Sequence, residues 1–134
     1  KVKSVGNYSF YGCEELIQVF LPVCQELDEQ CFNGCKNVKI LNMPNVQKIG
    51  SWQFCGCSSL KDLIIPSVEE IGENCYYGCD SLESIDSKLD ANQFKCSDWC
   101  KQNGGCPICR GHLQNCLKKG NDEQNRLMIQ KELE

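Results

Sequence analysis

Several features that would identify a catalytic or membrane protein are missing from this sequence. There is one histidine, and no nucleophile is paired with a recognisable base, so no reaction can be assigned. No run of 18 apolar residues occurs, which excludes a membrane-spanning helix. The net charge of −4 argues against a nucleic-acid-binding surface. The chain opens with KVKSV, without an apolar leader, and this is typical of a piece of a longer chain or of a chain whose leader is gone.

Cysteine, in contrast, is abundant, with 13 residues among 134, and part of it belongs to a repeat of 22 residues. A Gly-Cys pair recurs at this step at Gly12-Cys13, Gly34-Cys35, Gly56-Cys57 and Gly78-Cys79. An aromatic residue comes two positions before each glycine, at Phe10, Phe32, Phe54 and Tyr76. Apolar residues also keep this step, for example at Leu16, Val38, Leu60 and Leu82. So many columns in phase indicate four copies of one structural unit.

The pattern within one unit predicts a coil. The segment LKDLII, residues 60–65, ends with apolar residues at alternate positions, which is the period of a β-strand. Pro66 ends that strand because it lacks the N–H for a further ladder bond. One unit cannot bury its own apolar edge, whereas units stacked about 4.8 Å apart bury a continuous core. We therefore expect a β-rich solenoid of about four turns, a right-handed coil with a parallel sheet on its concave side.

The residues of these units resemble a known family. The phrase VEEIGENCYYGCDSLESI, with LIIPSVEEIG before it, is similar to the BspA-like (treponemal-type) leucine-rich repeats, and the resemblance covers residues 1–87. It implies a leucine-rich repeat fold and a non-enzymatic binding module, of a kind often displayed on the surfaces of bacteria and protists. The chain departs from the family pattern at Asp28, where the other units have glycine.

The Gly-Cys column predicts a ladder of buried thiols inside the coil, because free cysteine packs as a small apolar residue. Disulfides between neighbouring turns are the alternative, although the direction of the strands would strain them. A ladder of this kind says little about the redox compartment. The odd number of cysteines and the missing leader favour the cell interior over the surface that the resemblance suggests.

The repeat ends near residue 87, and we expect a connector over 88–95, a cap over 96–116 and a helix over 117–134. Six soft ligands fall within the cap, namely Cys96, Cys100, Cys106, Cys109, His112 and Cys116. A C-x3-C pair followed by a C-x2-C pair is spacing that lets thiolates hold one tetrahedral zinc ion in a structural site. A disulfide-stapled cap and a set of reduced thiols remain alternatives, while a redox role for Cys106 and Cys109 lacks the βαβ context.

The outward positions of the long strands predict a surface for a protein partner. These positions are Gln18, Phe20, Ile40, Asn42, Asp62, Ile64, Ser84 and Asp86. Exposed Phe20, Ile40 and Ile64 on a rigid face suit a partner, unless the tail covers them. The predicted function is protein–protein recognition without catalysis. A RING-like ubiquitin-transfer adaptor, in which the repeats select the target, and a structural subunit of a large assembly are the alternatives.

Overall fold

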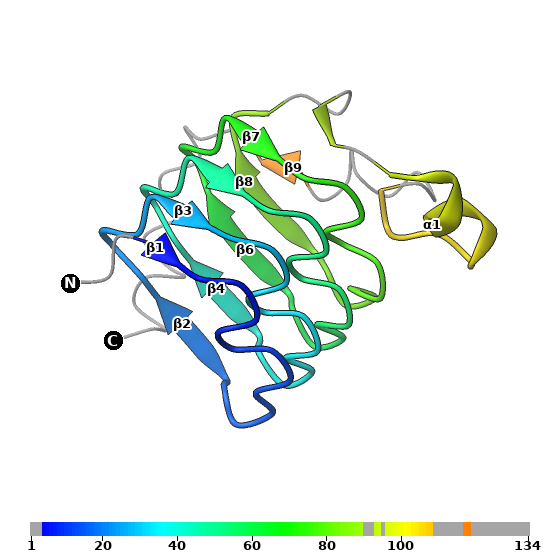
Figure 1. The fold of residues 1–134 in the computed structure, drawn as a ribbon, viewed down its shortest axis with the longest axis horizontal. Coiled ribbons are helices and arrows are strands. Elements are labelled where there is room, and N and C mark those ends of the chain that lie inside the picture. The colour runs from blue at the N-terminus through cyan, green and yellow to red at the C-terminus, as the bar shows by residue number, and fades with distance from the viewer. Residues whose placement is uncertain (1–3, 90–92, 95, 109–116, 119–134) are drawn as a thin grey trace.

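The protein is a coil of four stacked rungs, seen in a computed structural model that describes residues 4–89, 93–94, 96–108 and 117–118 (Figure 1). Each rung contributes one strand to each of two parallel sheets. The sheet of short strands, which we call sheet A, contains β1 (Ser4–Val5), β3 (Glu26–Leu27), β5 (Lys48–Ile49) and β7 (Glu70–Ile71). The other, sheet B, contains β2 (Gln18–Phe20), β4 (Ile40–Asn42), β6 (Asp62–Ile65), β8 (Ser84–Ser87) and β9 (Leu117–Lys118). The predicted four-turn solenoid is confirmed.

The register of sheet B follows the sequence repeat. Leu41 lies opposite Leu63, which lies opposite Ile85, so each step across the sheet is one unit of 22 residues. All three side chains are fully buried, because alternate residues of a strand point to opposite sides and these point into the coil. Equivalent side chains therefore form a continuous file through the stack, and no rung buries its apolar edge alone.

The segment between sheets A and B stacks as closely as the strands do. Gly12, Gly34, Gly56 and Gly78 all have positive φ, between 68° and 83°. A Cβ at Gly78 would lie only 3.1 Å from the nitrogen of Gly56, so a side chain here would press on the rung below. Glycine fits this column for both reasons, since it adopts positive φ without strain and leaves room for the neighbouring rung.

The thiols of the Gly-Cys column form the predicted buried ladder. The Cys35, Cys57 and Cys79 side chains donate to the carbonyl oxygens of Phe10, Phe32 and Phe54, at 3.0, 3.1 and 3.0 Å respectively. Each of these bonds links one rung to the rung before it. No disulfide joins the cysteines of the four rungs, so the alternative of disulfides between turns has no support there. Burial raises the pKa of the Cys35 thiol to about 11, which keeps it neutral.

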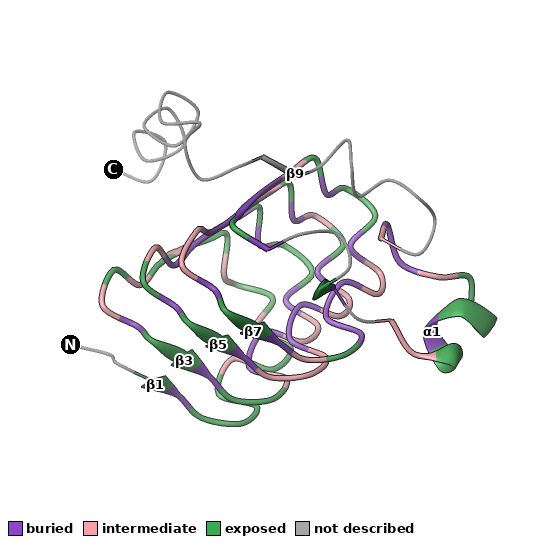
Figure 2. Cartoon of the chain, turned by 90° about the horizontal axis from the view of Figure 1, so that it is seen from above, coloured by how far each residue is buried: buried purple, intermediate pink, exposed green. Residues whose placement is uncertain are grey.

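Two elements beyond the repeat differ from expectation. Leu117 and Lys118 form β9, which extends sheet B beside β8, instead of opening the predicted helix; the rest of that prediction, residues 119–134, lies outside the described residues. A short helix that the sequence did not indicate, α1 (Asp98–Gln102), lies at the end of the coil opposite β1 and β2 (Figures 1 and 2). No helix in the described ranges has the length and apolar character needed to cross a bilayer.

Candidate metal centre and candidate binding face

Helix α1 is tied to the last rung through the residue that caps its N-terminus. Ser97 caps the helix, because its hydroxyl accepts a hydrogen bond from the Cys100 N–H at 3.3 Å. Both the backbone N–H and the hydroxyl of Ser97 lie 3.0 Å from Oδ1 of Asn74, a buried residue of the last rung. These bonds place Cys100, in the first turn of α1, against the end of the coil.

Aromatic contacts hold the other side of α1. The Trp99 ring meets the rings of Trp52 and Tyr77 edge-on, each with a centroid distance of 5.0 Å. The Tyr77 hydroxyl donates to the carbonyl oxygen of Asn103, just after the helix, at 2.7 Å. The Gly105 N–H then donates to the Cys100 carbonyl oxygen at 2.8 Å and turns the chain back toward the helix. This turn sets the position of the next residue, Cys106.

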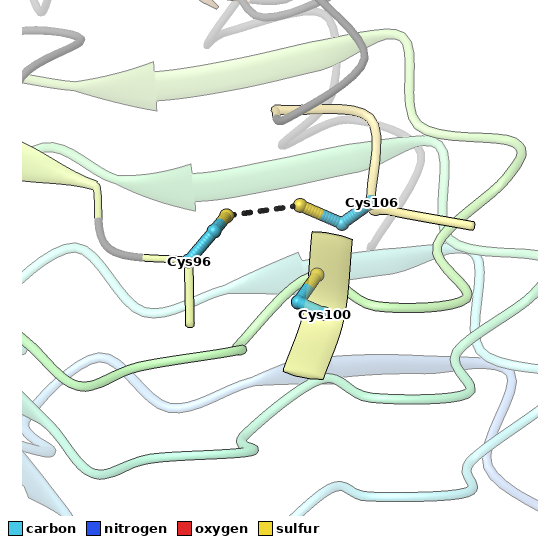
Figure 3. Close-up of side chains that lie close together, drawn as sticks. All are labelled: Cys96, Cys100 and Cys106. Atoms are coloured by element: carbon cyan, nitrogen blue, oxygen red, sulfur yellow. Dashed lines mark hydrogen bonds between the residues drawn. The ribbon is translucent and has the colours of Figure 1, made fainter. Parts of the chain in front are cut away.

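The fold brings together three of the predicted metal ligands, Cys96, Cys100 and Cys106 (Figure 3). Their sulfur atoms all lie within 4.8 Å of one another, and Sγ of Cys96 is 3.3 Å from Sγ of Cys106. In a tetrahedral site with Zn–S bonds of about 2.3 Å, ligand sulfurs are about 3.8 Å apart, so the cluster needs little adjustment to hold an ion. Cys100 and Cys106 are fully buried, and Cys96 is half-buried. The three residues, which we call the cysteine triad, are positioned to bind a metal.

The other predicted ligands, Cys109, His112 and Cys116, lie outside the described residues. Sequence spacing alone grouped all six ligands and could not say which of them meet. The disulfide alternative has no support between Cys96 and Cys106, since their sulfur atoms are 3.3 Å apart and an S–S bond is about 2.05 Å long.

The predicted binding face on the outer side of sheet B is only partly open. Phe20 is 43% exposed, Gln18 is exposed, and Asp62 and Ser84 are intermediate. The remaining members are buried, with exposures of 7% for Ile40, 2% for Asn42, 1% for Ile64 and 6% for Asp86. The prediction that Ile40 and Ile64 are exposed is therefore wrong.

The position of the two isoleucines explains that correction. Neither belongs to the hydrophobic cluster that fills the coil, whereas their strand neighbours Leu41 and Leu63 do. The isoleucines thus keep the outward direction that strand alternation gives them, and their burial means that the outer side of β4 and β6 is covered. Strand periodicity fixes the direction of a side chain and carries no information about what lies above the sheet.

The first rung carries most of the large hydrophobic side chains that are exposed, and of these the sequence predicted exposure only for Phe20. Tyr8, Tyr11, Ile17 and Phe20 are between 43% and 55% exposed, and Trp99 is the only other large hydrophobic side chain exposed in the described residues. We call these four residues the first-rung surface. Their exposure could have been predicted from their position in the first unit, because no described rung covers the outer side of that unit.

Comparison with known protein families identifies the same repeat. The family model described as "BspA type Leucine rich repeat region" matches residues 1–100 in six copies, which extends the resemblance beyond residue 87 to the end of the first turn of α1. No curated protein and no solved structure matches the chain. The cysteine-rich part beyond residue 100 has no family match.

Proposed function

Because the chain belongs to the BspA-type leucine-rich repeat family, we propose that it is a non-enzymatic scaffold for protein–protein recognition. Stacked rungs give a rigid surface, so little conformational entropy is lost when a partner binds. Neither the ubiquitin-transfer adaptor nor the structural subunit of an assembly is favoured by the family match. We therefore propose protein–protein recognition alone, without ubiquitin transfer and without a structural role in a larger assembly.

We place the partner on the part of sheet B that is open, at β2. The observation that carries this proposal is Phe20, which is 43% exposed on a strand whose central residue, Val19, packs against the core. Ile17, 52% exposed, lies beside the same strand. Aromatic and aliphatic anchors of this kind on a fixed backbone account for much of the binding energy at protein interfaces. The covered residues Ile40, Asn42, Ile64 and Asp86 become available only to a partner that displaces what lies over them.

Site-specific photo-crosslinking tests this placement. A photoreactive phenylalanine analogue replaces Phe20 in one protein and Glu70, on sheet A, in the control. We expect discrete crosslinked species from position 20, and their loss when Ile17→Asp is added. Equal crosslinking from both positions, or crosslinks unaffected by Ile17→Asp, would contradict a partner site at β2.

We also propose that the ion held by the cysteine triad is zinc, in a structural role. Three sulfur ligands favour zinc over magnesium or calcium, which take oxygen ligands. A tetrahedral site takes one more ligand, for which the sequence offers Cys109, His112 and Cys116 as candidates. Native mass spectrometry of zinc-loaded protein is expected to show one ion per chain, lost in Cys100→Ser and kept in Cys55→Ser, which alters a half-buried thiol of the repeat. Retention of the ion by Cys100→Ser would refute the site.

A further inference from the structure

One buried hydroxyl group of the last rung has no hydrogen-bond partner among the described residues. Tyr76 occupies the aromatic column of the repeat, where the other three rungs have Phe10, Phe32 and Phe54. Its ring stacks on Phe54, with a centroid distance of 5.8 Å, and Phe94, near the end of the connector that leads to the cap, packs against it at 5.7 Å. Only the rung that faces the cap therefore carries a hydroxyl at this position.

The Tyr76 side chain is 3% exposed, and its hydroxyl finds no hydrogen-bond partner among the described residues. Phenylalanine would fill the same space without leaving a buried donor unpaired, as it does in the rungs below. Burial raises the pKa of the Tyr76 hydroxyl well above its usual value, which keeps it protonated. Two contacts bring Cys96 to this part of the last rung: Phe94, two residues before Cys96, packs on the Tyr76 ring, and the N–H of Ser97, the residue after Cys96, donates to Asn74, two residues before Tyr76.

We propose that Tyr76 is a positioning residue of the metal centre, and that its hydroxyl donates a hydrogen bond to a thiolate of the Cys96–Cys106 pair when the triad holds zinc. The proposal rests on the zinc site proposed above. A neutral thiol is a weak acceptor, whereas a metal-bound thiolate carries charge and accepts strongly. Binding of the ion would therefore supply the partner that this hydroxyl lacks.

This arrangement would couple the ion to the repeat. Tyr76 belongs to the last rung, and the triad belongs to the cap. A hydrogen bond between them would join the metal centre to the coil through a residue whose ring packs against both Phe54 and Phe94. Hydrogen bonds to metal ligands fix ligand orientation, and their loss commonly weakens metal affinity 10- to 100-fold.

Tyr76→Phe tests the proposal in the full chain, because it removes the hydroxyl and keeps the ring. Cobalt(II) is titrated into the reduced protein and followed by its thiolate charge-transfer absorption, and zinc affinity is then measured by displacement of cobalt. We expect Tyr76→Phe to weaken zinc affinity 10- to 100-fold. Without metal, the variant should unfold at the same temperature as the parent or a higher one, because the unpaired buried hydroxyl is gone.

Tyr77→Phe is the matched control. It removes the neighbouring hydroxyl, which already has a partner in the cap, the Asn103 carbonyl oxygen. It should lower the unfolding temperature with and without zinc. Unchanged zinc affinity in Tyr76→Phe, or a loss of stability in its metal-free form, would overturn the role of the hydroxyl. Absence of the charge-transfer band in the parent protein would instead overturn the zinc site itself.

Discussion

Gly72 offers a direct test of how closely the rungs stack. A Cβ at this position would lie 2.5 Å from the nitrogen and 2.7 Å from the Cα of Ser51, in the rung below. Non-bonded carbon atoms prefer separations of about 3.5–4.0 Å, so Gly72→Ala forces the two backbones apart by about 1 Å. Ser51 is not free to yield, because its carbonyl oxygen accepts from the Gln30 N–H at 3.1 Å and its hydroxyl from the Glu73 N–H at 3.2 Å.

We expect Gly72→Ala to lower the free energy of unfolding by about 1–3 kcal/mol, the usual cost of inserting a methyl group into a packed interior. For a chain of this size, that loss corresponds to a fall of about 4–12 °C in the unfolding temperature. Circular dichroism with heat and with urea measures both quantities. Since Gly72 does not have positive φ, the loss reports crowding between rungs and not backbone strain.

Gly6→Ala is the matched control for this experiment. Gly6 occupies the same column in the first rung, where the nearest atom to a new Cβ is the Ser9 hydroxyl at 3.7 Å, an ordinary contact. It should change the free energy of unfolding by less than about 0.5 kcal/mol. If the two substitutions lowered the free energy of unfolding equally, the loss in Gly72→Ala could not be due to crowding by the rung below, and the reasoning would be refuted.

Two further predictions concern the buried thiols and the two sides of sheet B. Burial raises the pKa of Cys35 to about 11 and that of Cys75 to about 12, whereas unfolded thiols ionise near about 8.5. The stabilisation from these neutral thiols is therefore fully present below about pH 8.5 and is lost as the pH rises through their pKa values in the folded protein. The urea concentration at the unfolding midpoint should decrease when the pH is raised from about 8 to about 11, and it should decrease less in Cys35→Ala. On sheet B, Leu63 is fully buried and Phe20 is 43% exposed. By urea unfolding, Leu63→Ala should therefore lower the free energy of unfolding by about 2–5 kcal/mol, and Phe20→Ala by less than about 1 kcal/mol. Similar losses for the two substitutions would contradict the assigned side-chain directions.

The repeat could be predicted from sequence because each of its contacts recurs at a fixed spacing. The pairing of Leu41 with Leu63 is one consequence of the 22-residue step, and the Cys57 thiol bond to the rung below is another. When similar residues recur at this step, the sequence predicts that equivalent residues of successive rungs are in contact. The direction of Ile64 could be predicted in the same way, but its 1% exposure could not, since the strand pattern carries no information about what lies over the sheet.

The cap could be predicted only as a set of ligands, because nothing in it recurs. Helix α1 has five residues, which is too short to form from its own hydrogen bonds, and it exists through its contacts with the last rung. Those contacts come from Asn74, Trp52 and Tyr77, which lie more than 20 residues before it. The unpaired hydroxyl of Tyr76 was visible in the sequence as the only tyrosine in its column, yet its meaning depends on where the triad lies.

The two ends of the coil show what the cap contributes. In the first rung, the inward side chains remain only partly buried, at Phe10, Leu16, Val19 and Leu21. Their equivalents in the last rung are almost fully buried, at Tyr76, Leu82, Ile85 and Ser87. The chain beyond the repeat supplies buried Phe94, Cys100 and Cys106 at that end, and so takes the place of a further rung.

A segment of this size, with one helix of five residues, buries too few apolar side chains to be stable by packing alone. A metal ion bound by three of its residues would provide the missing constraint, as in other small domains that depend on a structural ion. On this reasoning, a chelator should expose the last rung before it affects the first three. Hydrogen exchange would then rise first at the backbone amides that Leu82 and Ile85 contribute, while those of β4 stay protected.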